Sequence, residues 1–210
     1  MKKLWMSLGL IMLIVLLSAC GNNENVHEND KVDKNGKIRI IEYGDYKCPY
    51  CKKVENKIMP KLKRQYIDKG KVDYQFVNMA FLGKDSIIGS RAGHAVQSIA
   101  PKEYLTFQRL MFEQQPDNEK AWITTKLVDK QIDKLNIDNQ TKVKIKDDYK
   151  KKNSKSWEAA KKNSKSWEAA KKDRQQYKKN HIDTAPTIYV KGEKLKDPYK
   201  FSSYEKLLTD

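Results

Sequence analysis

The sequence predicts an α/β fold with an inserted helical subdomain, and three observations support this. A strand, a helix and a second strand follow one another between residues 37 and 83. From about residue 84 to residue 180, strand patterns vanish and helical periodicity dominates. Two short strand patterns return at residues 187–196. Because a strand–helix–strand unit is typical of α/β proteins with a parallel sheet, we expect one folded domain over residues 37–210.

The first strand and the helix after it have clear patterns. "KIRIIEY", residues 37–43, is rich in isoleucine and follows an Asn-Gly pair, which is typical of a buried strand. Beyond it, apolar residues recur at helical spacing on one face, at Val54, Ile58, Leu62 and Tyr66. Pro60 lies inside this pattern and lacks an N–H group, so we expect it to kink the helix. Residues 71–83 alternate and then become apolar, which predicts the second strand.

Within the helical segment, the decapeptide "KKNSKSWEAA" occurs twice in tandem, at residues 151–160 and 161–170. Two copies are too few for a solenoid, which needs about three repeats to bury its own core. We interpret the duplication as a lengthening of one surface helix, and a binding arm is the alternative. A last helix is predicted from residue 202 onward.

The N-terminus indicates export. Residues 1–19 have two lysines and then an apolar run that is too short for a stable spanning helix, as in a signal peptide. Leu17-Ser18-Ala19-Cys20 resembles the bacterial lipobox, so Cys20 is the expected lipid (palmitate) attachment site. The alternative is an ordinary signal peptide that happens to end in cysteine. Residues 20–36 are almost entirely polar and predict a tether that holds the domain outside the cell membrane.

The net charge of +16 raises the question of nucleic-acid binding. The lysines, however, are spread along helical stretches and alternate with aspartate and glutamate. No aromatic-rich basic strand or recognition helix accompanies them. We therefore expect a solvated basic surface and no nucleic-acid partner.

Two of the three cysteines, Cys48 and Cys51, lie in "GDYKCPYCKK". A structural zinc site requires four Cys or His ligands. The three histidines are widely scattered, so no metal is expected. His94 lies among small and apolar residues, where a packed or half-exposed histidine is expected rather than a ligand. As a structural staple the pair is weak, because a disulfide closing so short a loop removes little chain entropy. A redox-active dithiol is the third interpretation, and it accounts for more of the residues around the two cysteines.

At the start of a helix, Cys48 is expected to face unpaired N–H groups and the positive end of the helix dipole, which favour a thiolate. Lys47, Lys52 and Lys53 are expected to add positive potential. Cys51, one turn later, should point inward and stay protonated. We therefore expect the Cys48 sulfur to be reactive and to face solvent, and the pair to exchange disulfides through a mixed disulfide.

Two further residues fit this chemistry. Glu42 interrupts an otherwise apolar strand six residues before Cys48, and a carboxylate below the dithiol could carry a proton to or from Cys51. The alternative is that Glu42 occupies an exposed strand position. Pro186 comes just before a strand, where a cis Ala185–Pro186 bond would bring a backbone edge beside the dithiol.

These residues together resemble the thioredoxin-fold thiol:disulfide oxidoreductases of the DsbA family, most closely the lipoprotein members of low-GC Gram-positive bacteria such as staphylococci. The resemblance runs from about residue 37 to the C-terminus. It rests on Glu42, the Cys-Pro-Tyr-Cys box, the helical insertion and the Thr-Ala-Pro-Thr segment at residues 184–187. Tyr50 stands where the best-studied members have histidine.

The resemblance implies that Cys48 is the nucleophile, Cys51 the buried partner, Glu42 the proton-relay carboxylate and Pro186 the cis-proline. It also implies an extracytoplasmic oxidase without a cofactor, a monomer that forms disulfides in reduced, unfolded exported proteins. The acceptor that reoxidises it is not named by the sequence. The alternatives are an extracytoplasmic reductase or isomerase, and a non-catalytic lipid-anchored binding protein.

Overall fold

The computed structural model describes residues 31–118, 120–150 and 165–209, and within them one four-stranded sheet organises the domain. The strand order is β2-β1-β3-β4. The strands are β1 (Ile38–Gly44), β2 (Val72–Asn78), β3 (Thr187–Val190) and β4 (Glu193–Lys194). The predicted α/β fold with its closing hairpin is therefore confirmed.

The sheet is mixed, so the prediction of a parallel sheet was only partly right. β1 and β2 are parallel, whereas β3 is antiparallel to β1 with Thr187 opposite Tyr43. The reason is where the chain returns to the sheet: the Asn180 side chain donates a 2.8 Å hydrogen bond to the Tyr43 hydroxyl, at the carboxyl end of β1. β3 starts at that end and must run backwards. β2 also ends five residues earlier than predicted, at Asn78.

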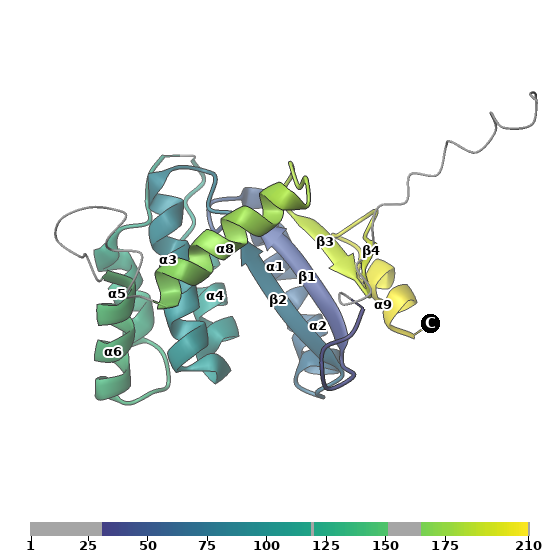
Figure 1. Ribbon diagram of the computed structural model, residues 1–210, viewed down its shortest axis with the longest axis horizontal. Helices are drawn as coiled ribbons and strands as arrows, with labels where there is room; N and C mark the ends of the chain where they lie inside the picture. Colours follow the sequence, from purple (N-terminus) through teal and green to yellow (C-terminus); the bar gives the residue numbers. More distant parts are fainter. Residues whose placement is uncertain (1–30, 119, 151–164, 210) are drawn as a thin grey trace, which may run out of the picture.

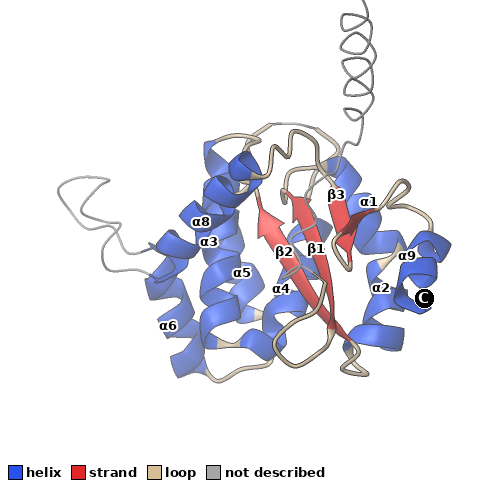
Figure 2. Ribbon diagram, turned by 45° about the vertical axis from the view of Figure 1, so that its right-hand side comes forward, coloured by secondary structure: helices blue, strands red, loops and turns tan. Residues whose placement is uncertain are grey.

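Helices cover both faces of the sheet (Figures 1 and 2). One face carries α1 (Pro49–Lys57), α2 (Met59–Leu62) and α9 (Phe201–Thr209), packed on Ile40 and Ile188. On the opposite face, α8 (Lys165–Lys179) and the turn after it cover Ile41 and Val77.

The helix after the dithiol is interrupted where the sequence predicts a kink. α1 ends at Lys57, and α2 begins at Met59 with Pro60 in its first turn. A π-helical turn, Lys63–Ile67, follows. The proline has no N–H group to continue the hydrogen-bond ladder, so the chain restarts as a new helix there.

The helical insertion lies beside the sheet (Figure 1). It contains α3 (Lys84–Ile99), a short 3₁₀ turn (Pro101–Glu103), α4 (Tyr104–Glu113), α5 (Thr125–Asp133) and α6 (Asn139–Lys150). α5 begins where Thr124 accepts a hydrogen bond from the Leu127 N–H, as a helix N-cap does. Most of the tandem decapeptide, residues 151–164, lies outside the described residues, and α8 begins in its second copy.

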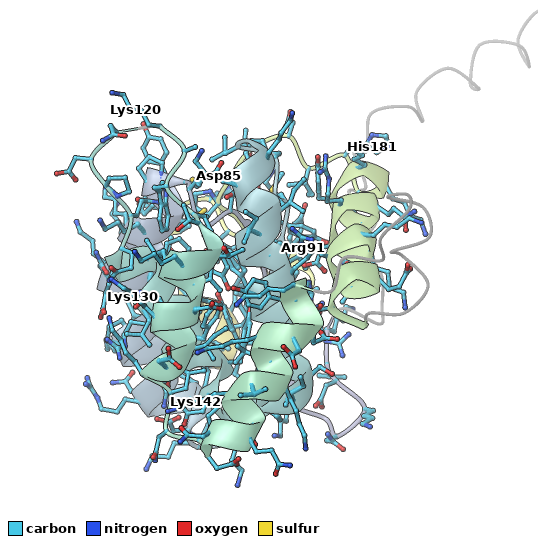
Figure 3. The ribbon with its side chains drawn as sticks, turned by 90° about the vertical axis from the view of Figure 1, so that its left-hand side faces the viewer. Asp85, Arg91, Lys120, Lys130, Lys142 and His181 are labelled. Carbon is cyan, nitrogen blue, oxygen red and sulfur yellow. The ribbon has the colours of Figure 1, made fainter. Side chains whose placement is uncertain are left out.

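Lysines project from the outer surface of the insertion, as Lys120 and Lys130 do in Figure 3. Others pair with carboxylates, as Lys146 does with Asp133 at 2.5 Å. In the described part of the chain, every helix is too short or too polar to cross a bilayer.

Candidate active site

The two cysteines lie at the junction of β1 and α1. Cys48 is the N-cap of α1, Pro49 occupies the first turn, and the Cys51 N–H donates to the Cys48 sulfur over 3.4 Å. Both thiols are free, so the site is in its dithiol form. This is the helix-start position that the sequence predicts for Cys48.

The Cys48 sulfur is less open than expected. The residue is only 4% exposed, which contradicts the expectation that it faces solvent freely. The reason is a contact that residue order does not reveal: the Cys48 thiol donates a 3.4 Å hydrogen bond to the Ala185 carbonyl. Tyr50, by contrast, is 59% exposed beside it. A reaction partner would therefore have to reach the sulfur past the Ala185 backbone.

The two thiols have opposite electrostatic surroundings. A hydrogen bond from the Cys51 thiol lowers the pKa of Cys48, and the N–H groups of Cys51 and Tyr50 act in the same direction against partial burial. Complete burial raises the pKa of Cys51, and the hydrogen bond and charge of Cys48 raise it further. Cys48 is thus the thiol that ionises first.

The neighbouring lysines contribute less than expected, because each has another partner. Lys47 forms a 3.0 Å ion pair with Asp85, and both side chains are largely buried. The Lys52 ammonium donates to the Gln115 carbonyl over 2.8 Å. Lys53 lies 4.7 Å from the centre of the Tyr199 ring. Local hydrogen bonds at the helix start, rather than these lysines, therefore favour the Cys48 thiolate.

Glu42 lies below the dithiol on β1 and is 3% exposed, so the alternative of an exposed strand position is wrong. Burial raises its pKa to about 8, against a hydrogen bond from the Tyr74 hydroxyl that stabilises the carboxylate. That hydrogen bond is 2.9 Å long. The negative charge of Glu42 in turn raises the pKa of Cys51. At neutral pH the buried carboxyl holds a proton close to the buried thiol.

The loop that carries Pro186 lies against Cys48. The Ala185–Pro186 peptide bond is cis, as the sequence suggests. The loop is tied down internally, because the Thr187 hydroxyl donates to the Thr184 carbonyl over 2.9 Å. Sequence separation hides this proximity, which the sheet creates by pairing Thr187 with Tyr43.

Asp45 organises the loops around the site, and sequence analysis missed it. Its carboxylate accepts hydrogen bonds from the N–H groups of Lys47, Phe81 and Leu82 and from the Ser86 hydroxyl, at 2.9–3.1 Å. Burial nonetheless raises its pKa. Its position between the strand and the dithiol was the only available signal.

Gly44 is a second residue that sequence analysis missed. A Cβ atom built there would lie 2.6 Å from the Phe76 ring and 3.1 Å from the Cys51 sulfur. The space that a side chain would occupy is thus filled by an aromatic ring and by the buried sulfur. The glycine permits Cys51 to pack directly on the end of β1.

Three polar side chains extend the site below Glu42: Tyr74 on β2, Glu55 on α1 and Gln108 on α4. Gln108 donates to the Glu55 carboxylate over 2.9 Å and to the Tyr74 hydroxyl over 3.2 Å. The sequence held one usable signal, since Glu55 follows Cys51 by four residues and therefore shares its helix face.

His94 is packed, as expected, and holds helices together. Its Nε2 lies 2.9 Å from the Asp173 carboxylate, which also accepts the Asn78 N–H over 2.8 Å. Across the described residues, no three His, Cys, Asp or Glu side chains gather in a way that would hold a metal ion. Cys20, the expected lipid site, lies outside the described residues.

Comparison with known proteins gives consistent matches. Residues 33–210 match the family described as Thioredoxin. The chain is 31% identical over 207 residues to a probable disulfide bond formation protein D of Bacillus cereus, covering 89% of this chain and 88% of that protein. It is 32% identical over 170 residues to disulfide bond formation protein D of Bacillus subtilis, covering 81% and 69%.

Solved structures agree with this. The chain is similar to oxidised BdbD from Bacillus subtilis, with a TM-score of 0.69 and 29% identity over 85% of this chain and 91% of that one. Chlamydia trachomatis DsbA has a TM-score of 0.62 at 17% identity, covering 85% and 88%, and shows the fold alone.

Proposed function

The chain belongs to the thioredoxin family, as a DsbA-like thiol–disulfide oxidoreductase, and on this premise we propose that it is a dithiol oxidase that forms disulfides in exported proteins. The opposite perturbation of its two cysteines carries the proposal. A lowered pKa of Cys48 stabilises the thiolate of the reduced form. Stabilising the reduced form makes the disulfide a stronger oxidant, which favours transfer of oxidising equivalents to a substrate.

In the first step, a substrate thiolate attacks the Cys48 sulfur of the oxidised enzyme. A bond forms between the substrate sulfur and Cys48, and the Cys48–Cys51 bond breaks. Cys51 leaves with the electron pair as a thiolate. A second substrate thiolate then attacks the substrate sulfur of the mixed disulfide and releases the Cys48 thiolate. The substrate loses two electrons, and the enzyme dithiol gains them.

Glu42 supplies the proton that the leaving Cys51 takes up. The raised pKa of Cys51 means that its thiolate is a strong base in this site. Glu42, with a pKa of about 8, is protonated at neutral pH and is the buried acid next to it. After the transfer, the Tyr74 hydroxyl stabilises the new carboxylate. General acid assistance of this kind needs an acid whose pKa lies near the working pH.

The Pro186 loop is proposed to bind the substrate backbone beside Cys48. The Ala185 carbonyl lies 3.4 Å from the sulfur that the substrate must reach. An extended peptide that pairs with this backbone edge would bring its own cysteine to Cys48. The exposed Tyr50 ring, two residues along the chain from Cys48, would offer an apolar surface to the same peptide.

The protein is proposed to work as a monomer on the outer side of the cell membrane, held by a lipid on Cys20 and a tether over residues 20–36. Its substrates are reduced, unfolded exported proteins, and a separate electron acceptor must reoxidise the dithiol. The support is the signal-peptide pattern of residues 1–19 and the lipobox that follows. Substituting Cys20 by serine should release the protein from the membrane fraction and abolish incorporation of labelled palmitate.

A reductase or isomerase is the alternative direction, and family membership argues against a non-catalytic binding protein. The reduction potential, measured by equilibration with glutathione, separates the two directions. A value above about −180 mV supports an oxidase, whereas a value near −270 mV supports a reductase and would overturn the proposal. Cys48→Ala should abolish oxidation of a reduced, unfolded substrate. In Cys51→Ala, the Cys48 thiolate can still attack a disulfide of an oxidised substrate, and the mixed disulfide should accumulate because Cys51 is absent to displace the substrate from it.

A further inference from the structure

A second buried acid lies close to the dithiol, and the reaction described above gives it no task. Glu55 is on α1, one turn after Cys51, and is 7% exposed. Burial raises its pKa to about 7. Buried carboxylates are rare unless they are paired or hydrogen-bonded, so its partners indicate what it does.

A continuous chain of hydrogen bonds links Glu55 to Glu42. The Gln108 amide nitrogen donates to the Glu55 carboxylate over 2.9 Å and to the Tyr74 hydroxyl over 3.2 Å. The Tyr74 hydroxyl then donates to the Glu42 carboxylate over 2.9 Å. α1, α4, β2 and β1 each contribute one member, so the chain crosses the seam between the sheet and the insertion.

The chain also has a fixed direction. An amide nitrogen only donates, so the Tyr74 oxygen must accept from Gln108 and its hydrogen remains available for Glu42. The same nitrogen donates to Glu55, an arrangement that suits Glu55 as an ionised acceptor. Gln108 is 1% exposed, so its side chain is shielded from bulk solvent.

The two carboxylates are close enough to affect each other's ionisation. The three hydrogen bonds of 2.9, 3.2 and 2.9 Å share their middle atoms, so the terminal oxygens lie at most about 9 Å apart. At the effective dielectric constant of a protein interior, a unit charge at this distance shifts a pKa by about one unit. The charge of Glu55 raises the pKa of Glu42.

We infer that Glu55 is a positioning residue for the disulfide exchange: acting through Gln108 and Tyr74, its negative charge keeps on Glu42 the proton that Cys51 takes up. The inference rests on the proposed role of Glu42 and adds a residue to it. Glu55 touches neither sulfur and acts only through Glu42. Since Glu55 is the less buried acid and has the lower pKa, it ionises first as the pH rises.

Other charged groups face this pair from the surrounding helices. On α4, Arg109 lowers the pKa of Glu55 and Glu113 raises it, and the two side chains also form an ion pair with each other. At the other end, the Cys48 thiolate raises the pKa of Glu42. The negative charge of Glu42 raises the pKa of the neighbouring tyrosines, Tyr104 on α4 and Tyr204 on α9. These groups set the background against which the effect of Glu55 is measured.

The test is the variant Glu55→Gln, which removes the charge and keeps an oxygen for Gln108 to donate to. The Glu42 carboxyl is followed by ¹³C NMR against pH in full-length reduced protein, and the Glu42→Gln spectrum identifies its signal. The expected result is a fall in the Glu42 pKa of about one unit. Glutathione should reduce the oxidised protein more slowly once Glu42 has lost its proton. The pH at which this slowing sets in should fall by the same amount as the Glu42 pKa.

Tyr74→Phe provides a test of opposite sign. It keeps the charge of Glu55 but removes the hydrogen bond that stabilises the Glu42 carboxylate, so the Glu42 pKa should rise. Glu205→Gln is the matched control, because that half-exposed carboxylate on α9 pairs with Lys61 of α2, and its loss should leave the Glu42 titration unchanged.

A Glu42 titration that is the same in Glu55→Gln and in the unmodified protein overturns the inference. A Glu42 pKa that shifts in Glu55→Gln while the pH dependence of reduction by glutathione stays the same also overturns it. Should Glu55→Gln not fold, the titration of the unmodified protein tests the inference instead. Its Glu42 signal should show a second, smaller inflection at the pH where Glu55 titrates. A single inflection refutes the coupling. These titrations need no substrate, so their outcome is separate from a reduction potential that would overturn the oxidase function.

Discussion

Replacing Glu42 by glutamine should stabilise the folded protein at neutral pH, although Glu42 belongs to the proposed machinery. The exchange keeps the size of the side chain and an oxygen that accepts the Tyr74 hydroxyl. What it removes is an ionisable group that is 3% exposed and has a pKa of about 8, raised from 4.5 by burial.

The magnitude follows from proton linkage. Between pH 4.5 and about 8, the folded state holds a proton on Glu42 that the unfolded state has lost. The free energy of unfolding therefore falls by about 1.4 kcal/mol for each pH unit in this window as the pH rises. At pH 7 the accumulated loss is about 3 kcal/mol, and below pH 4.5 it is absent. Glu42→Gln should regain this amount at pH 7 and almost nothing at pH 4.5.

The assay is urea unfolding of the reduced protein and of Glu42→Gln at pH 4.5, 5.5 and 7. Glu205→Gln again serves as the control, because its carboxylate is half-exposed on α9 and takes no part in the Glu42 hydrogen bonds. A stability difference that is the same at all three pH values, or a variant less stable than the unmodified protein at pH 7, would refute the electrostatic reasoning for the site.

Three further predictions concern the residues around Glu42. Absorbance at 240 nm should show Cys48 ionising below the ordinary cysteine pKa of 9.0, because its hydrogen bonds favour the thiolate; a midpoint at or above 9.0 contradicts this. Gly44→Ala should lower the free energy of unfolding by about 1–3 kcal/mol in urea titrations, since the new methyl group would meet the Phe76 ring at 2.6 Å. Asp45→Ala should lower it by about 2 kcal/mol or more, because the Leu82 N–H and three other donors lose their acceptor; a smaller loss would mean that water replaces the carboxylate.

Local patterns carried most of the fold. Isoleucine content and the preceding Asn-Gly pair located β1, and Pro60 located the break between α1 and α2, because both signals depend on neighbouring residues alone. The direction of β3 was not predictable in this way. It depends on where a helical segment of about a hundred residues returns to the sheet, and no local signal encodes that.

The residues of the site also divide into those that local patterns predict and those that they do not. The cysteines could be placed at a helix start from the Cys-Pro-Tyr-Cys spacing, and the location of Glu42 in an apolar strand pointed to burial. The contact of Cys48 with the Ala185 carbonyl joins residues 137 positions apart, so the burial of the sulfur was not expected. Likewise, Gln108 comes from α4 and is an ordinary helix residue until the fold brings it to Tyr74.

The packing around the dithiol limits how much of this enzyme could be deleted without loss of the site. Cys48, Cys51 and Phe76 share one hydrophobic core with residues of the insertion such as Phe107 and Ile123. Deleting the insertion would therefore not leave a minimal catalyst, since part of the apolar core that packs around the sulfurs would be lost with it. Substitutions in these helices would therefore change the surroundings of both sulfurs while the Cys-Pro-Tyr-Cys box itself stays unchanged.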